Sequence, residues 1–340
     1  MQVRTFDGRT STQLDLDPAP TIQSISAAGF RWIDIRADGP ADPAVASLLT
    51  GWGFSTSDAA YVMRSHSAGV FEVKDGRVVG TTWVAADGAS MLSEVHFSWS
   101  PQVLITVRFG GDAAVAGVTE SVARSHANLF DEPTTAFAVV LQLFLGSVNS
   151  ELTALGEQLD TLDGAIIEEA HPRQLTELRD LRGLVIPMSR RFEPYADEVS
   201  QALVDPTGLP GMDSAGVAHL QAYSVRLGDV VTRIGDLTDQ LRDCAQDFQT
   251  EVGNQQGNRI NQLTIVSIVF LPITFLTGYF GMNFQWLGNE TMSFASWLLL
   301  GVVMPLLVVV ASIVVLTNRG YLRRRADRQR VRDHNDTSES

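Results

Sequence analysis

Apolar and polar positions alternate along the first third of the chain, from about residue 28 to residue 110, and this pattern predicts β-strands. A turn signal, Asp75-Gly76, joins two of these segments as a hairpin. The predicted strands cover residues 30–35, 69–73, 77–83, 91–98 and 103–109. We therefore expect residues 1–130 to form an α+β domain with a mixed sheet and a few helices.

Helical periodicity replaces the alternation after Gly111 and predicts helices over residues 113–129, 133–170 and 173–204. The turn signals Asp131-Glu132-Pro133 and His171-Pro172 separate these helices. Pro187 is expected to bend the third of them. A fourth helix is predicted from about Asp213 to Tyr279, so that residues 131–262 form a cytoplasmic helical region with a stalk helix at about 213–262.

The fourth predicted helix carries apolar residues at alternating intervals of three and four. This spacing is a heptad seam, which requires partner helices and therefore demands oligomerisation. Cys244 lies on the seam and is expected to be a small core residue, not a reactive thiol. The seam residues are Leu220, Tyr223, Leu227, Val230, Ile234, Leu237, Leu241, Cys244 and Phe248.

Two long runs near the end of the chain, residues 260–289 and 291–318, contain no Asp, Glu, Lys or Arg. Each is long enough to cross a bilayer as a helix, which takes about 20 apolar residues. We expect transmembrane helices at 263–284 and 295–317, joined by an external loop at 285–294. No apolar run of that length is expected upstream of Arg259, and the first residues lack the apolar stretch of a signal peptide.

The basic residues that flank these runs predict the orientation in the membrane. Residues 319–340 hold seven Arg and four acidic residues, whereas the loop between the runs holds only Glu290. By the positive-inside rule, both termini and the basic tail at 318–340 are cytoplasmic. We expect a multi-pass protein of the inner (plasma) membrane that contacts the lipid bilayer through both runs.

Charge and composition exclude several classes of function. Residues 1–318 hold 18 basic and 35 acidic residues, so their net charge of −17 would repel nucleic acid but attract cations. The single cysteine and six scattered histidines give no zinc-site spacing, and no nucleotide-binding glycine motif occurs. We expect neither an enzyme nor a partner nucleic acid or nucleotide, and no permanently bound cofactor.

Acidic residues also repeat every seven positions beside the seam, at Asp229, Asp236 and Asp243. One interpretation is a lining that gathers metal cations. The other is a solvated helix face balanced by Arg233 and Arg242, as is usual for long helices. The sequence leaves both interpretations open.

Small and polar residues share one face of the first apolar run. Their helical spacing suits either close helix packing or the lining of a pore. Pro272 lies in this run and leaves the Ile268 carbonyl without its usual backbone donor. The residues on this face are Ile260, Leu263, Thr264, Ser267, Leu271, Thr274 and Gly278.

The sequence that ends this run, Tyr279-Phe280-Gly281-Met282-Asn283-Phe284, resembles the YGMNF signature of the CorA family of divalent-cation channels. The preceding residues 271–278, LPITFLTG, resemble the family's (L/M)-P-(L/I)-T-F-x-x-G pattern. Upstream, Trp32-Ile33-Asp34 and the run LITV at residues 104–107 resemble two of the family's strands. The likeness therefore covers most of the chain.

The resemblance implies a funnel-shaped homopentamer in which five first spans line one pore. It implies that Gly281, Met282 and Asn283 form a selectivity filter whose oxygens contact a hydrated ion, since Mg²⁺ loses its water reluctantly. Leu271, Leu263 and Ile260 would act as apolar constrictions, and Thr274 and Gly278 as polar positions. The implied function is Mg²⁺ uptake down the electrochemical gradient, with Co²⁺ and Ni²⁺ as further ions and with gating by cytoplasmic Mg²⁺.

Two other functions remain open at this point. One is a Zn²⁺ transporter of the same superfamily, including a proton-coupled one, although such members tend to have GVN where this chain has Gly281-Met282-Asn283. The other is a membrane-anchored coiled-coil sensor or scaffold without a pore. A scaffold would explain the seam and the two spans, but not the polar positions in helical register.

Overall fold

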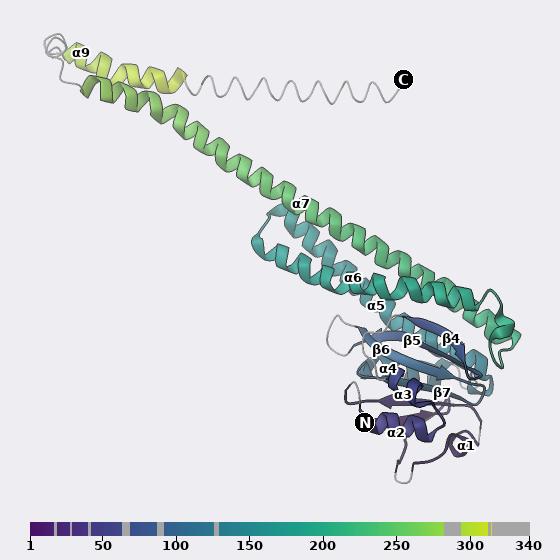
Figure 1. Cartoon of the computed structure of the whole chain (residues 1–340). Helices are drawn as coiled ribbons and strands as arrows, with labels where there is room; N and C mark the ends of the chain where they lie inside the picture. The colour runs from purple at the N-terminus through teal and green to yellow at the C-terminus, as the bar shows by residue number, and fades with distance from the viewer. Residues whose placement is uncertain are drawn as a thin grey trace, which may run out of the picture. The chain divides into compact units, whose positions relative to one another are not determined.

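The computed structural model describes residues 1–16, 19–27, 29–39, 42–62, 69–86, 92–125, 129–281, 294–311 and 314. The chain divides into two compact units, Met1–Phe248 and Gln249–Ser340. Helix α7, Ser214–Gly281, contributes to both. Figure 1 shows the elements of each unit.

A seven-stranded mixed sheet lies at the centre of the first unit. Its strands are β1 (Gln2–Phe6), β2 (Ser11–Gln13), β3 (Arg31–Arg36), β4 (Val70–Lys74), β5 (Arg77–Ala85), β6 (Leu92–Trp99) and β7 (Val103–Arg108). Their order is β2-β1-β3-β7-β6-β5-β4, with β3 parallel to β7 and the other neighbours antiparallel. The five predicted strands are confirmed, whereas β1 and β2 were not predicted.

Helices cover both faces of the sheet (Figure 1). On one face, α1 (Ile22–Ile25), α2 (Pro43–Gly51) and α3 (Thr56–Val62) enclose a smaller core around Ile33, Ile35 and Ile105. On the other face, α4 (Asp112–Ser125) and α5 (Pro133–Glu168) bury Trp32, with α6 (Pro172–Ala202) and α7 in the same core. Short 3₁₀ turns, Leu129–Asp131 and Pro206–Gly208, precede α5 and α7.

Proline starts both long antiparallel helices, because a missing N–H has no cost in the first helical turn. Pro133 begins α5 and Pro172 begins α6. At α6 the His171 backbone N–H also donates to the Gln174 side chain over 2.6 Å, which satisfies one more polar group at the turn. α6 continues through Pro187 to Ala202, so the predicted helix 173–204 is one element.

The heptad seam of α7 is buried inside the same chain. From Leu220 to Cys244 its residues are at most 6% exposed and share one core with α5 and α6. A Cβ atom placed on Gly156 of α5 would lie 3.6 Å from Leu237 of α7, which shows how closely these helices pack. The inference that the seam demands oligomerisation is therefore wrong, because two helices of the same chain cover it. The assignment of Cys244 to the core is confirmed.

Helix α5 also corrects the expectation that no apolar run of membrane length precedes Arg259. Pro133–Glu168 is long and apolar enough for a membrane span, and half of its most apolar window is buried. Phe137, Val140 and Phe144 are fully buried in the core beside the sheet. Packing against the sheet therefore accounts for the apolar composition of α5.

A buried polar network joins the two strands that carry the W-I-D and LITV sequences. Arg108 binds Asp34 through Nε and Nη2, and Nη2 lies 2.9 Å from Oδ2. Thr106 donates to the same carboxylate over 2.8 Å and accepts from the Trp32 indole over 2.9 Å. Burial opposes the charge of Arg108, yet Asp34 and Asp112 raise its pKa above the usual value. The network ties the parallel strands β3 and β7 together in the core.

Candidate functional site

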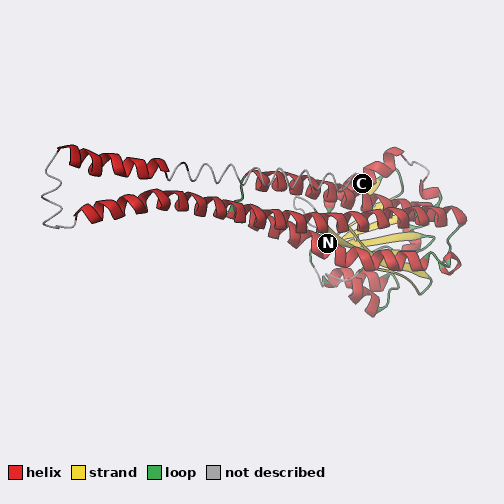
Figure 2. Cartoon of the chain, turned by 90° about the horizontal axis from the view of Figure 1, so that it is seen from above, coloured by secondary structure: helices red, strands yellow, loops and turns green. Residues whose placement is uncertain are grey.

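The candidate site lies in the second unit, on the part of α7 that follows Phe248. In the described residues this unit also contains α9 (Phe294–Leu298), the π-helical segment Leu299–Val303 and further helix to residue 311. In Figures 1 and 2 this second helical stretch runs back along the end of α7. The most apolar window of α7 has the length and hydropathy of a membrane span, and none of it is buried.

One face of this part of α7 is partly covered within the chain. Val269, Pro272, Ile273 and Leu276 are half-buried, whereas their neighbours along the helix are exposed. At 3.6 residues per turn these four residues lie on a single face. Among the side chains that the structure describes in the second helical stretch, those of Pro305, Val308 and Val309 are half-buried. The pattern indicates that the two stretches pack through these faces.

The predicted small and polar residues lie on the opposite face. Ser267, Leu271, Thr274 and Gly278 are centred about 180° away from Val269, Pro272, Ile273 and Leu276, at 100° per residue. We call this face the polar stripe; all of its members are exposed. They are Ile260, Leu263, Thr264, Ser267, Leu271, Thr274, Gly278 and Gly281.

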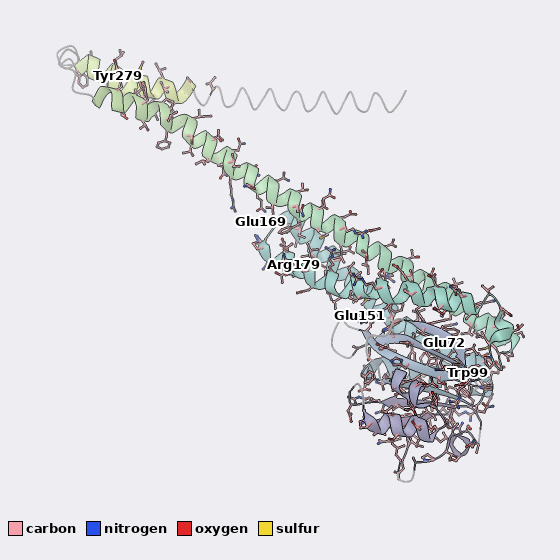
Figure 3. The ribbon with its side chains drawn as sticks, viewed as in Figure 1. Glu72, Trp99, Glu151, Glu169, Arg179 and Tyr279 are labelled. Atoms are coloured by element: carbon pink, nitrogen blue, oxygen red, sulfur yellow. The ribbon has the colours of Figure 1, made fainter. Side chains whose placement is uncertain are left out.

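Large apolar side chains accompany the polar stripe. Leu271 is 75% exposed on the stripe itself, and Phe275 beside it is 71% exposed. The Phe275 ring stacks on that of Tyr279 with 6.4 Å between the ring centroids, and Figure 3 labels Tyr279 near the end of the helix. Contiguous apolar surface of this kind is unfavourable in water, so this part of α7 requires a cover of lipid or protein.

The hydroxyl groups of the stripe are held in one orientation. Thr264 donates to the Ile260 carbonyl over 2.8 Å, Ser267 to that of Leu263 over 2.9 Å, and Thr274 to that of Phe270 over 2.8 Å. Because each hydroxyl hydrogen is used within the helix, the oxygen lone pairs remain to accept further hydrogen bonds. The stripe therefore presents acceptors, which suit the water shell of a cation.

Gln256 extends the stripe by one turn and was not predicted as a site residue. It lies four residues before Ile260 and eleven before Ser267, so it shares their face of the unbroken helix. Its carboxamide is exposed. The same spacing rule could have found it, but the prediction began at the charge-free run and Gln256 precedes that run.

The described residues include only the first residue of the predicted filter. Gly281 is the last residue of α7 and is exposed on the stripe. Met282, Asn283, the loop up to residue 293 and the basic tail lie outside the described residues. The proposed roles of Met282 and Asn283 therefore rest on the sequence.

The predicted acidic metal stripe lies in the first unit and is exposed at Asp229, Asp236 and Asp243. The arginines expected to balance it have other partners: Arg242 pairs with Asp239, and Arg233 donates to the Asn149 side chain over 2.9 Å. Within the described part of one chain, no group of three or more His, Cys, Asp or Glu residues is placed to hold a metal ion. Metal binding here stays a prediction that would need a second copy of the chain.

The chain combines an α+β domain with long helices, and the last part of α7 is apolar and bears a polar stripe. This combination is typical of a membrane protein with a folded domain outside the bilayer. The chain matches the family described as CorA-like Mg²⁺ transporter protein over residues 27–319. It belongs to the CorA family.

Curated relatives of the chain are named as transport proteins for different metals. The putative metal ion transporter YfjQ of Bacillus subtilis is 26% identical over 161 residues, which is 46% of this chain and 49% of that protein. The cobalt/magnesium transport protein CorA of Thermotoga maritima is 21% identical over 40% of this chain and 38% of its own length. The zinc transport protein ZntB of Yersinia enterocolitica is 25% identical over 41% of this chain and 42% of its own length. The alignments thus span half or less of each relative.

Solved structures share the fold. The CorA magnesium transporter from Methanocaldococcus jannaschii aligns over 93% of this chain and 97% of its own, with a TM-score of 0.75 and 14% identity. The full-length CmaX protein aligns over 84% of this chain and 87% of its own, with a TM-score of 0.63 and 15% identity. At these identities the likeness concerns the fold: an α+β domain followed by long helices.

Proposed function

We propose that this chain is a divalent-cation transporter that assembles as a homopentamer around a pore lined by the polar stripe of α7. The observation that carries the proposal is the placement of the stripe, exposed and opposite the face that packs within the chain. A single such helix cannot enclose a water-filled path, so copies of the chain must supply the remaining wall. Membership of an ion-transporter family favours this function over catalysis.

The chemistry of the stripe fits passage of a hydrated ion. Mg²⁺ gives up its coordinated water molecules reluctantly, and those water molecules donate hydrogen bonds. The oxygens of Thr264, Ser267 and Thr274 can accept them, because their own hydrogens bind helix carbonyls. Leu271, Leu263 and Ile260 would form apolar rings that close the path by excluding water. Five copies of Asn283, with the carbonyls of Gly281 and Met282, would form the outer filter.

We assign Mg²⁺ as the main ion, on the Gly281-Met282-Asn283 sequence, with Co²⁺ and Ni²⁺ as further substrates. Transport would follow the electrochemical gradient and would be closed by cytoplasmic Mg²⁺. The likeness to both magnesium and zinc transport proteins keeps Zn²⁺, with or without proton coupling, as the second candidate.

In this proposal the protein lies in the inner (plasma) membrane with both termini in the cytoplasm. The transmembrane helices occupy residues 263–284 and 295–317, with the loop 285–294 outside. The α+β domain, the helical region 131–262 and the tail 318–340 are cytoplasmic. The acidic residues Asp229, Asp236 and Asp243 would take part in regulation only where a neighbouring copy completes a metal site.

Ion flux into liposomes tests this function directly. The purified protein is reconstituted, and Mg²⁺ and Zn²⁺ entry are followed in parallel with and without an imposed proton gradient. We expect Mg²⁺ entry that is driven by a negative interior, is indifferent to the proton gradient and is lost in Asn283→Ala. Asn258→Ala is the matched control, because Asn258 lies about 180° from the stripe on the same helix and should leave flux unchanged.

The alternatives give different results in the same assay. Zn²⁺ entry that depends on the proton gradient would assign the protein to zinc transport. Folded, assembled protein that passes neither ion would contradict the pore and favour a scaffold. Native mass spectrometry of the same sample tests the pentamer independently of transport.

A further inference from the structure

One half of the sheet in the first unit has a polar surface that the transport proposal does not use. On the face covered by α2 and α3, the outer strands β4, β5 and β6 present Glu72, Lys74, Arg77, His96 and Ser98. A cavity of about 340 Å³ lies over these strands, walled by α3 and the turn at Phe54. Its volume falls within the range of small-molecule sites. Figure 3 labels Glu72 on β4.

The two cations of this cavity differ in their partners. Lys74 pairs with Asp58, and its pKa is raised by that bond and by the nearby carboxylates of Glu72 and Asp75. Arg77 instead lies over the Phe54 ring, with 4.5 Å from its guanidinium carbon to the ring centroid. Among the described residues, Arg77 has no carboxylate partner. Its donors are therefore available to a ligand.

The floor of the cavity supplies a second donor. Ser98 is 8% exposed, and its side chain lines the cavity. Its hydroxyl group can donate a hydrogen bond to an oxygen of a bound anion. His96, two residues earlier on the same face, is held by Glu94 at 3.0 Å and by Thr81 at 3.2 Å. The floor is thus fixed before any ligand binds.

We propose that this cavity binds a small molecule that carries a carboxylate or phosphate group. The anionic group would accept hydrogen bonds from the Arg77 guanidinium and the Ser98 hydroxyl, as arginine binds both kinds of oxyanion well. The remainder of the molecule would contact Phe54 and Val79. A metal ion fits less well, because the Asp58 carboxylate already binds Lys74 and no group of three or more His, Cys, Asp or Glu among the described residues is placed to hold a metal ion. The cytoplasmic domain would then hold an anion site separate from the ion path.

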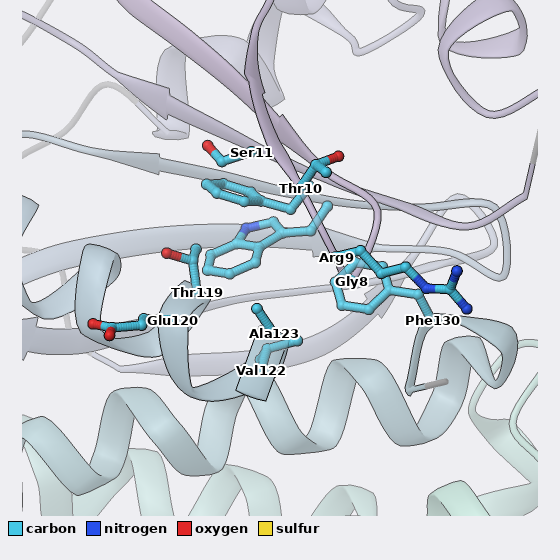
Figure 4. Close-up of a pocket in the computed structure, with 11 residues that line it drawn as sticks. Gly8, Arg9, Thr10, Ser11, Thr119, Glu120, Val122, Ala123 and Phe130 are labelled. Atoms are coloured by element: carbon cyan, nitrogen blue, oxygen red, sulfur yellow. The ribbon is translucent and has the colours of Figure 1, made fainter. Parts of the chain in front are cut away.

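A second cavity in the same unit provides the contrast and the control. It has about 200 Å³ and lies between the β1–β2 turn and α4, over Phe6, Trp32 and Phe130 (Figure 4). Figure 4 shows that the Arg9 side chain leaves its rim and points away from the aromatic rings. Arg9 is exposed, so it is a cation of the same kind outside the proposed site.

Isothermal titration calorimetry on the full-length protein in nanodiscs tests the proposal. Inorganic phosphate and citrate are titrated separately at constant ionic strength, with chloride as the blank. We expect saturable binding of at least one of them, at one site per chain. Arg77→Gln should raise its Kd about tenfold or more, because a hydrogen bond to a charged group is worth about one factor of ten in affinity. Ser98→Ala should raise it several-fold, and Arg9→Gln should leave it unchanged.

Phosphate binding alone or citrate binding alone identifies the anionic group, and either supports the site. Absence of saturable binding of both anions at millimolar concentration would overturn the proposal, as would equal weakening by Arg9→Gln and Arg77→Gln. A thermal unfolding scan of each variant checks that it is folded. If the Arg77→Gln variant is unfolded, Ser98→Ala and Arg77→Lys still decide the outcome. Arg77→Lys keeps the positive charge but loses the bidentate hydrogen-bonding geometry of the guanidinium group.

Discussion

Helix α7 contains two stretches with the same alternating spacing of three and four residues and opposite burial. From Leu220 to Cys244 the spaced residues are buried against α5 and α6. From Ile260 to Gly281 the spaced residues are exposed, and only the opposite face is half-buried. The spacing therefore tells which residues share a face. It does not tell which part of the chain, or which other molecule, covers that face.

The two stretches also differ on the faces away from the spaced residues. Beside the seam, Asp229, Asp236 and Arg242 give the helix a charged outer surface. The second stretch has no charged residue after Arg259, and Val266, Phe270 and Phe275 are exposed around the stripe. A helix that is apolar nearly all round belongs inside a protein or a membrane. The first stretch is thus suited to water on its outer side, whereas the second stretch requires an apolar cover.

The largest expected effect concerns the thiol of Cys244, on the buried stretch. Burial, with the nearby carboxylates of Asp163 and Asp247, raises the pKa of Cys244 to about 12 from an ordinary value of 9.0. At pH 8 the thiolate fraction of Cys244 should be on the order of 1000-fold lower than that of a thiol with the ordinary pKa, since each pKa unit is a factor of ten. We expect iodoacetamide to label Cys244 in the native protein far more slowly than in urea. Equal rates would show that the seam is open.

Truncation of one leucine in each stretch should separate their contributions to folding. Leu237→Ala leaves a cavity in the core of the first unit and should lower its free energy of unfolding by about 2–5 kcal/mol. Leu271→Ala removes a side chain that is 75% exposed in the chain and should change the same quantity by less than about 0.5 kcal/mol. Denaturant unfolding followed by tryptophan fluorescence measures both. Similar losses would contradict the assignment of the two faces.

A smaller effect is expected where the seam meets α6. Tyr223 donates a hydrogen bond to the Tyr195 hydroxyl over 2.9 Å, and both side chains are buried. Tyr223→Phe should cost about 1 kcal/mol, the usual net value of such a bond. A double-mutant cycle with Tyr195→Phe measures the coupling, and additive losses would show that the bond contributes nothing.

The same pair predicts how stability depends on alkaline pH. Burial raises the pKa of Tyr223 to about 12 and that of Tyr195 well above its usual value of 10.0. The folded state therefore holds protons that the unfolded state loses above pH 10, and stability should fall as pH rises from about 10 towards 12. Tyr223→Phe should make this decline shallower. A pH-independent free energy of unfolding in that range would contradict the buried pair.

The sequence predicted the faces of the elements better than their partners. Alternation located β3 to β7, but β2 is three residues long and exposed, and β1 buries only Val3 and Phe6, so neither has a strong apolar pattern. The seam residues were predicted correctly. The residues of α5 that cover them lie about 80 residues earlier in the chain, so local periodicity could not identify them. For the same reason the apolar start of α5 gave no sign that the sheet covers it.

At the site, local spacing was sufficient for most residues. The polar stripe follows from helical phase alone, and the structure adds the direction of the hydroxyl hydrogens, which residue identity cannot give. Gln256 was missed because the absence of charge, not the helical phase, set the start of the predicted span. The cavity over β4 to β6 was also missed, because its residues come from three strands, α3 and the turn at Phe54, which meet only in the folded domain.

The central claim is that the stripe faces a water-filled path while the opposite face of α7 packs within the chain. Ser267→Cys and its matched control Ile273→Cys, each in a Cys244→Ala background, test this in liposomes that carry Mg²⁺ flux. A charged, water-soluble methanethiosulfonate reagent should block flux through Ser267→Cys and leave Ile273→Cys unaffected. Block of Ile273→Cys alone, or equal block of both, would contradict the claim.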